Sequence, residues 1–152
     1  MTKDALDVPA SAPAVKLEGK KIIIVDDNKI NMEIMVNMLK EDGYSVETAS
    51  GGKECLKKFS KSKEGTYGLI FMDLHMPKMD GFETSKQIRQ MNRADALSVN
   101  IAALTVDDSE DILEKCAISG MNSYLLKPAT KEAVRLLING GNPLEPSFFE
   151  ED

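Results

Sequence analysis

The 152-residue sequence has few of the residues and segments that mark specialised classes of protein. It contains only two cysteines and one histidine, which excludes a disulfide framework and a metal site built from several histidines. No apolar run approaches the ~20 residues that a membrane-spanning helix needs, and residues 1–20 lack the layout of a signal peptide. We therefore predict a cytoplasmic protein without membrane insertion.

Basic residues are also too few for a nucleic-acid-binding surface. Nineteen lysines and arginines stand against 25 aspartates and glutamates, giving a formal net charge of -6. A surface that neutralises phosphates needs a basic excess, so we expect no nucleic acid among the partners. Cys55 and Cys116 each lie in a helical pattern, where a thiol behaves as a small apolar group. We predict that both are free, as in a reducing compartment.

One continuous patterned block covers residues 20–139, without an internal repeat or a second core. Residues 1–19 mix alanine, proline, serine and charges without a period, which is typical of a flexible leader. Residues 140–152 combine glycines and prolines with four acids, and we interpret them as an acidic flexible tail. Phe148 and Phe149 are the part of this tail that could dock on a surface.

Short apolar segments alternate with helical patterns along the block. The predicted strands are residues 21–25, 44–49, 69–72, 99–104 and 123–126. The predicted helices are residues 30–41, 52–60, 82–91, 107–119 and 131–138. Strict alternation of this kind predicts an α/β fold with a doubly wound parallel sheet. Five units fit the flavodoxin-like (βα)5 fold with strand order 2-1-3-4-5.

Polar residues follow four of the five strands at the sheet edge where ligands bind in such folds. Asp26 and Asp27 follow the first strand, Asp73 the third, Thr105 the fourth and Lys127 the fifth. Three clustered carboxylates repel one another, and a cation that prefers oxygen ligands, such as Mg²⁺, would relieve the repulsion. The hydroxyl and the ammonium would then bind phosphate oxygens. We therefore predict a phosphoryl site.

These motifs resemble the receiver domain of two-component response regulators and hybrid histidine kinases. They are VDDNKIN at 25–31, MDLHMPKMDG at 72–81, Thr105 after IAAL, and LKP at 126–128. The resemblance covers roughly residues 20–139, and it is specific because the motifs occur in this order at these strand ends. The sequence leaves open whether the chain is a stand-alone receiver or part of a hybrid kinase.

The resemblance implies a role for each site residue. Asp73 would accept the phosphoryl group from the phosphohistidine of a histidine kinase or a histidine phosphotransfer protein. Asp26, Asp27 and Asp73, with the backbone carbonyl of His75, would hold Mg²⁺, for which Mn²⁺ can substitute. Lys127 would pair first with the acceptor carboxylate and then with the phosphoryl group.

The resemblance also implies a conformational switch. Thr105 would move to hydrogen-bond a phosphoryl oxygen, and the rotamer of Tyr124 would follow, while the Lys127–Pro128 bond is often cis in this family. Phosphorylation would thereby change the face formed by the fourth helix, the fifth strand and the last helix, and so control partner binding. We expect a monomer, or a dimer that forms on phosphorylation. We expect no enzymatic activity beyond the domain's own phosphorylation and dephosphorylation.

Residue 106 departs from the family pattern, and two alternative functions stay open. Val106 stands where the family commonly has a smaller residue, which predicts a slower or altered loss of the phosphoryl group. A phosphatase of the haloacid dehalogenase type would require a second aspartate two residues after Asp73, where His75 stands. A receiver-like scaffold that is never phosphorylated is the other alternative, and the complete set of site residues argues against it.

Overall fold

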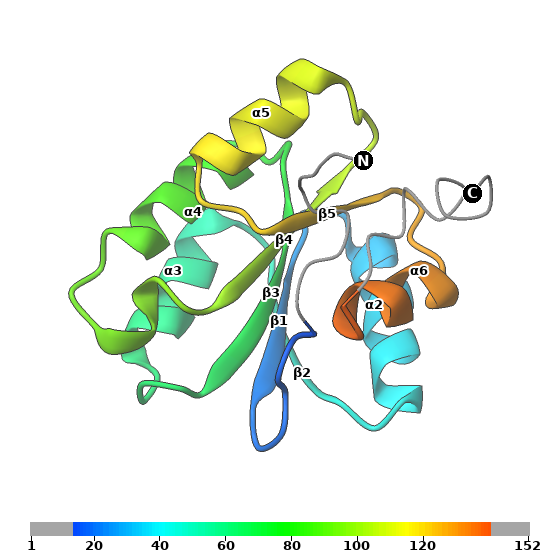
Figure 1. The fold of residues 1–152 in the computed structure, drawn as a ribbon, viewed down its shortest axis with the longest axis horizontal. Coiled ribbons are helices and arrows are strands. Elements are labelled where there is room, and N and C mark those ends of the chain that lie inside the picture. The colour runs from blue at the N-terminus through cyan, green and yellow to red at the C-terminus, as the bar shows by residue number, and fades with distance from the viewer. Residues whose placement is uncertain (1–13, 141–152) are drawn as a thin grey trace, which may run out of the picture.

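Buried apolar segments form a five-stranded parallel sheet at the centre of the molecule (Figure 1). The computed structural model describes residues 14–140. The strands are β1 (Lys21–Val25), β2 (Ser45–Ala49), β3 (Tyr67–Asp73), β4 (Asn100–Thr105) and β5 (Ser123–Leu126). Their order is β2-β1-β3-β4-β5, with every neighbouring pair parallel. This confirms the predicted flavodoxin-like sheet.

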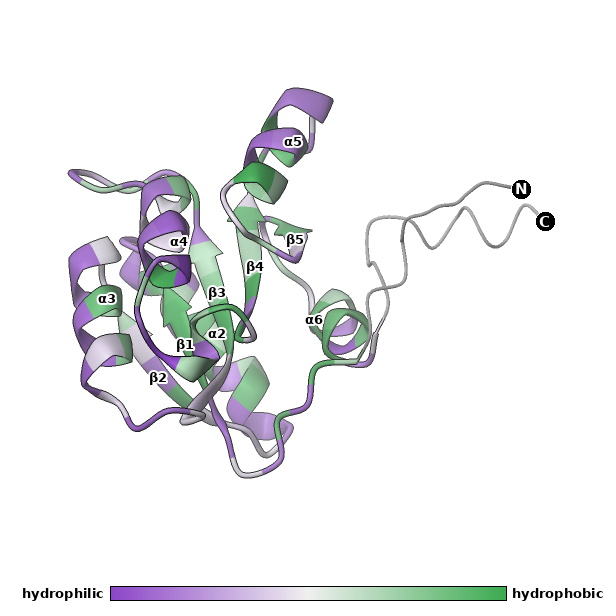
Figure 2. Ribbon diagram, turned by 60° about the vertical axis from the view of Figure 1, so that its left-hand side comes forward, coloured by the Kyte–Doolittle hydropathy of each residue, from purple (hydrophilic) through white to green (hydrophobic). Residues whose placement is uncertain are grey.

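Helices cover both faces of the sheet. They are α2 (Lys29–Glu41), α3 (Gly52–Lys61), α4 (Gly81–Arg89), α5 (Glu110–Ile118) and α6 (Lys131–Ile138), with a short 3-10 helix, η1 (Ala94–Ala96). Helices α2 and α6 lie on one face, and α3, α4 and α5 on the other (Figure 1). Each layer has its own apolar core, and in Figure 2 the hydrophobic colour gathers on the strands while the helices carry hydrophilic stretches.

Strand β3 begins two residues earlier than the apolar run predicts. Tyr67 joins it because the phenol donates a hydrogen bond to Glu47 at 2.7 Å, so the ring is buried with its hydroxyl satisfied. Gly68 lies at a register shift between β1 and β3, where a Cβ would come within 2.9 Å of Leu17. These are long-range contacts, and a local pattern of residues contains no sign of them.

The predicted start of the fourth helix at residue 107 is wrong, because α5 begins at Glu110. The carboxylate of Asp107 accepts a hydrogen bond from the amide of Ser109 at 2.8 Å, which holds this segment in a turn. Helix α5 is also lightly attached, since Cys116 is the buried residue among its nine. Both cysteines are free and buried, as predicted.

The segment before β1 contacts the end of the last helix. The amide of Val15 donates a hydrogen bond to the carbonyl of Ile138 at 2.9 Å, and Val15 and Leu17 pack against the core beneath α2 and α6. Residues 1–13 of the predicted leader and residues 141–152 of the predicted tail lie outside the described residues. Between residues 14 and 140, no helix has the length and apolar character needed to cross a membrane.

Candidate functional site

The parallel register of β1 and β3 brings the acidic residues together. Val25 pairs with Met72, so the residues that follow them leave the sheet side by side. Asp26, Asp27 and Asp73 each offer a carboxylate oxygen, and these atoms all lie within 4.8 Å of one another. Asp26 and Asp73 are buried, whereas Asp27 is exposed. The structure therefore brings together the three carboxylates proposed as metal ligands.

Lys127 reaches the same cluster from the end of β5. Its ammonium nitrogen lies 2.9 Å from Oδ1 of Asp73 and 3.5 Å from Oδ2 of Asp26. The peptide bond between Lys127 and Pro128 is cis, as the resemblance implies. Three carboxylates and one ammonium leave a net charge of about -2 when all four groups are ionised. A divalent cation would balance that charge, and an all-oxygen set of ligands suits a hard cation such as Mg²⁺.

Lys127 neutralises only part of the negative charge of the buried acids. Burial raises the pKa of the Asp73 carboxyl to about 6, and the neighbouring Asp26 acts in the same direction. The hydrogen bond and the charge of Lys127 oppose this rise in pKa without cancelling it. One lysine is thus insufficient to neutralise the cluster, which favours the entry of a cation.

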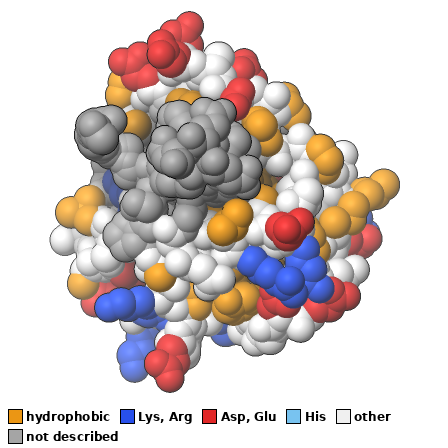
Figure 3. All heavy atoms as spheres, turned by 45° about the vertical axis from the view of Figure 1, so that its right-hand side comes forward, with side chains coloured by type: hydrophobic (Ala, Val, Ile, Leu, Met, Phe, Trp, Pro, Cys, Tyr) orange, Lys and Arg blue, Asp and Glu red, His pale blue; other side chains and the backbone are white. Residues whose placement is uncertain are grey.

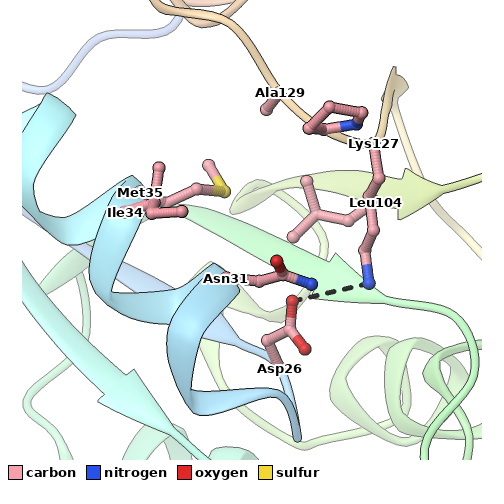
Figure 4. Close-up of a pocket in the computed structure, with 8 residues that line it drawn as sticks. Asp26, Asn31, Ile34, Met35, Leu104, Lys127 and Ala129 are labelled. Atoms are coloured by element: carbon pink, nitrogen blue, oxygen red, sulfur yellow. Dashed lines mark ion pairs between the residues drawn. The ribbon is translucent and has the colours of Figure 1, made fainter.

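A small cavity of about 40 Å³ adjoins the ion pair (Figure 4). In Figure 4, Lys127 extends toward Asp26, with the side chain of Asn31 beside them. Ile34, Met35, Leu104, Pro128 and Ala129 complete the lining. Asn31 lines the cavity although its residue type alone predicts no role in the site. Its place in the first turn of α2, four residues after Asp27, is the signal that could have found it.

Thr105 is buried, but its hydroxyl is not hydrogen-bonded to Asp73 among the described contacts. Its Oγ1 donates to the carbonyl of Asp107 at 2.9 Å and accepts from the amide of Asp107 at 3.0 Å. Tyr124 is half-buried and packs against the core beside β4, where it pairs in register with Ala103. The structure thus places Thr105 at the edge of the site with its hydroxyl turned to its own loop.

His75 contacts Asp73 through its amide. The N–H of His75 donates to Oδ1 of Asp73 at 3.3 Å. The role of its carbonyl as a metal ligand stays a prediction. Val106, the residue after Thr105, is 71% exposed.

Gly81 is a residue whose importance the sequence analysis missed. A Cβ at this position would lie 2.3 Å from the carbonyl oxygen of Asp73, so the start of α4 packs directly on the backbone of Asp73. Asp80 caps the helix by accepting a hydrogen bond from the amide of Glu83 at 2.8 Å. An Asp-Gly pair before a helical pattern predicts a helix start. The close packing of that start against β3 is a tertiary contact, which the sequence pattern does not predict.

Residues 22–139 match the family model for the response regulator receiver domain. Hybrid signal transduction histidine kinase L of Dictyostelium discoideum is 36% identical over 124 residues, which covers 81% of this chain and 7% of that protein. The osmosensing histidine protein kinase SLN1 of Saccharomyces cerevisiae is 35% identical over 134 residues, or 83% of this chain and 11% of that protein. The chain thus spans a small part of these relatives.

Solved structures agree with this match. The receiver domain of the Saccharomyces cerevisiae response regulator Ssk1, solved with the histidine phosphotransfer protein Ypd1, has a TM-score of 0.68 and 33% identity. That alignment covers 84% of this chain and 88% of that one. The receiver domain of the sensor histidine kinase PA1611 from Pseudomonas aeruginosa has a TM-score of 0.70 and 29% identity, over 79% of this chain and 94% of that one. It holds a magnesium ion in its active site cleft.

Proposed function

Since this chain belongs to the response regulator receiver domain family, we propose that Asp73 is the residue that accepts a phosphoryl group in a phosphorelay. The observation that supports this choice is the position of its carboxylate. Asp73 is buried at the end of β3, 2.9 Å from the ammonium of Lys127 and beside two further acids. The nucleophilic carboxylate of Asp73 therefore lies beside the Lys127 ammonium and beside carboxylates that could bind a metal cation.

The transfer needs one bond to form and one to break. An oxygen of the ionised Asp73 carboxylate attacks the phosphorus of a phosphohistidine, and the new O–P bond forms as the P–N bond breaks. The electron pair of the P–N bond returns to the imidazole nitrogen. Lys127 stays beside the acceptor and neutralises negative charge on the phosphoryl group.

Asp26, Asp27 and Asp73 are the residues that would hold Mg²⁺, with the carbonyl of His75 as a further ligand. Their clustered oxygens and their negative charge support this assignment, as does the magnesium ion in the PA1611 receiver. When bound, the cation would supply charge neutralisation for the phosphoryl oxygens. Mn²⁺ accepts the same kind of ligands, so we expect it to substitute.

Phosphorylation would alter the two hydrogen bonds that the Thr105 hydroxyl makes within its own loop. If its hydroxyl turns to a phosphoryl oxygen, Asp107 loses a partner, and the loop before α5 is released. Because α5 buries one residue, Cys116, of its nine, we expect its position to change easily. The face formed by α5, β5 and α6 would then differ between the two states, and Tyr124 would move with it.

A histidine kinase or a histidine phosphotransfer protein is the proposed phosphoryl donor. Ile30 and Ile34 lie one turn apart on α2, and they are 70% and 52% exposed beside the site. Two exposed isoleucines next to the acceptor would suit an apolar contact with the donor. The complex between Ypd1 and the Ssk1 receiver supports this class of donor. We propose a cytoplasmic signalling domain that is monomeric until phosphorylated and catalyses only its own phosphorylation and dephosphorylation.

Phosphotransfer from a panel of histidine-phosphorylated donors, with and without Mg²⁺, tests the proposal. The parent should gain a base-labile phosphoryl group, and Asp73→Asn should gain none while keeping the parent's circular dichroism spectrum. Asp108→Asn is the matched control, because Asp108 is an exposed acid of the loop before α5. Uptake by Asp73→Asn at the parental rate would refute the acceptor assignment. An unlabelled parent would favour the scaffold alternative, and turnover of phosphate esters would favour the phosphatase.

A further inference from the structure

A second concave surface lies at the amino-terminal ends of strands β1 and β2, whereas the proposed phosphoryl site lies at the carboxyl ends of the strands. This groove has a volume of about 650 Å³, within the range of small-ligand and peptide pockets. Its walls come from the segment before β1, from the starts of β1 and β2, and from the end of α6. The lining residues used below are Val15, Leu17, Lys20, Lys21, Tyr44 and Ile138.

The groove is held open by contacts at both ends of the segment 14–20. At one end Val15 is hydrogen-bonded to Ile138, and at the other the ammonium of Lys20 donates to the carbonyl of Gly65 at 2.9 Å. Between them Leu17 is seated on Gly68. The apolar wall therefore exists before anything binds, so a ligand would not have to order it.

We propose that residues 141–152 of this same chain fold back into the groove. Asn139 lines the groove, so this segment starts beside it. Phe148 follows Asn139 by nine positions, which allows a span of roughly 30 Å and lets both phenylalanines reach any part of the groove. A ligand tethered at this distance has an effective concentration of about 1 mM, so weak contacts suffice to hold it.

The chemistry of the segment matches the groove. Residues 141–152 contain two adjacent phenylalanines, then three acids, and no lysine or arginine. The groove offers apolar side chains from Val15, Leu17, Tyr44 and Ile138. Two lysines, Lys20 and Lys21, also line the groove, against the single lining acid Glu18. The phenylalanines would cover the apolar wall, and the acids would lie beside the lysines.

A groove on α3 is the strongest rival surface. It has a volume of about 450 Å³ and is lined by Lys57, Lys58 and Lys61, with Tyr67 as its large ring. It is richer in lysine, but it gives a pair of phenylalanines little apolar surface. It lies on the face of the sheet opposite α6 (Figure 1), so it serves as the comparison surface in the experiment.

Paramagnetic relaxation in the full chain tests the docking. A nitroxide would be attached to Ser147→Cys, because Cys55 and Cys116 are buried and burial raises the pKa of their thiols to about 12 and about 11. Labelling the parent in the same way shows whether the native thiols stay unmodified. The amide signals of Val15, Leu17 and Tyr44 should lose most of their intensity.

The same measurement on Phe148→Ala/Phe149→Ala, made in the labelled Ser147→Cys chain, should restore those signals. High salt should restore them in part, because it screens the acids from the lysines. Broadening at Lys57 and Lys61 instead would place the segment on α3 and overturn the proposal. Uniform, weak broadening would also overturn it. Broadening that appears only between a labelled and an isotope-enriched copy would assign the groove to a second molecule, and would reject docking within one chain.

Discussion

The ammonium nitrogen of Lys127 lies 2.9 Å from Oδ1 of Asp73, so the proposed acceptor is oriented by a cation before any phosphoryl group arrives. The same nitrogen lies 3.5 Å from Asp26, and one positive charge therefore serves two buried carboxylates. Asp27 has no ion pair among residues 14–140. This unequal sharing leads to different predictions for the three acids and the lysine.

Lys127→Met should lower the rate of phosphoryl uptake by roughly 10²-fold, the typical loss when one group that stabilises transition-state charge is removed. The methionine keeps an unbranched side chain, shorter by one atom, and removes the charge beside Asp73. The rate would be measured by single-turnover transfer at saturating Mg²⁺. Lys131→Met is the control, because Lys131 lies at the start of α6 and pairs with Glu41. Equal rates for the parent and Lys127→Met would contradict the role of the lysine.

Asp27→Asn should remove most of the gain in the free energy of unfolding that Mg²⁺ gives the parent. In the parent, Mg²⁺ at 100 times its dissociation constant should raise the free energy of unfolding by about 2.7 kcal/mol. The variant lacks one ligand and should lose most of this gain. In chelator it should be at least as stable as the parent, because one of three mutually repelling charges is gone. Chemical unfolding with and without Mg²⁺ checks both statements, and an unchanged gain would contradict the assignment of Asp27.

Gly81→Ala should disturb the backbone of Asp73, the proposed acceptor, without contacting its side chain. The added Cβ would meet the carbonyl oxygen of Asp73 at 2.3 Å, and backbone cannot yield there as a flexible side chain could. Overpacking of this kind costs about 1–3 kcal/mol and should also slow phosphoryl uptake. Gly51→Ala is the control, since a Cβ there meets nothing within 4 Å. Parental stability and uptake in Gly81→Ala would show that the contact relaxes freely.

Parallel strands explain how much of the site could be predicted from sequence. Once alternating patterns predict a parallel sheet, the residues after each strand must meet at one edge, and this placed Asp26, Asp73 and Lys127 correctly. The position of the Thr105 hydroxyl could not be predicted this way. It depends on the local turn at Asp107, where a side-chain hydrogen bond competes with the start of a helix.

Contacts between distant segments could not be predicted from the sequence either. Nothing in residues 14–19 signals that Val15 bonds to Ile138, more than a hundred positions away in the chain. The 3-10 helix η1 was missed because three residues show no periodicity. The acids near the start of α5 were predicted to be helical, and Figure 3 shows acidic side chains gathered at that end of the molecule, where they face solvent.

Val106→Ala should shorten the lifetime of the aspartyl phosphate several-fold. Val106 is the residue after Thr105, and its branched side chain is exposed, so we expect it to shield the phosphoryl group from the hydrolytic water. A smaller side chain should admit that water more readily. The measurement is the decay of the phosphorylated form after the donor is removed. Leu97→Ala is the control, as an apolar residue that is 78% exposed and outside the site. Equal decay rates would dispose of the hypothesis.

Asp95 should give the stability of this domain an acid-sensitive component. Its buried carboxylate accepts hydrogen bonds from Nε of Arg93 at 2.6 Å and from the amide of Gly65 at 2.9 Å. Burial opposes ionisation of Asp95, but these hydrogen bonds outweigh it and hold the pKa below its usual value. A carboxyl whose pKa is lower in the folded state stabilises the fold above its unfolded pKa of about 3.9. That contribution is lost as the pH falls through the folded pKa.

Asp95→Asn should therefore lower the free energy of unfolding by about 1.5–3 kcal/mol at neutral pH, the usual value of a hydrogen bond to a charged group. The difference from the parent should shrink below about pH 4 and vanish once Asp95 is protonated in the folded parent. Urea unfolding of both proteins across this range measures the difference, with Asp108→Asn as an exposed control. A difference that does not change with pH would mean that the shape of the carboxylate, rather than its charge, fastens η1 to the start of β3.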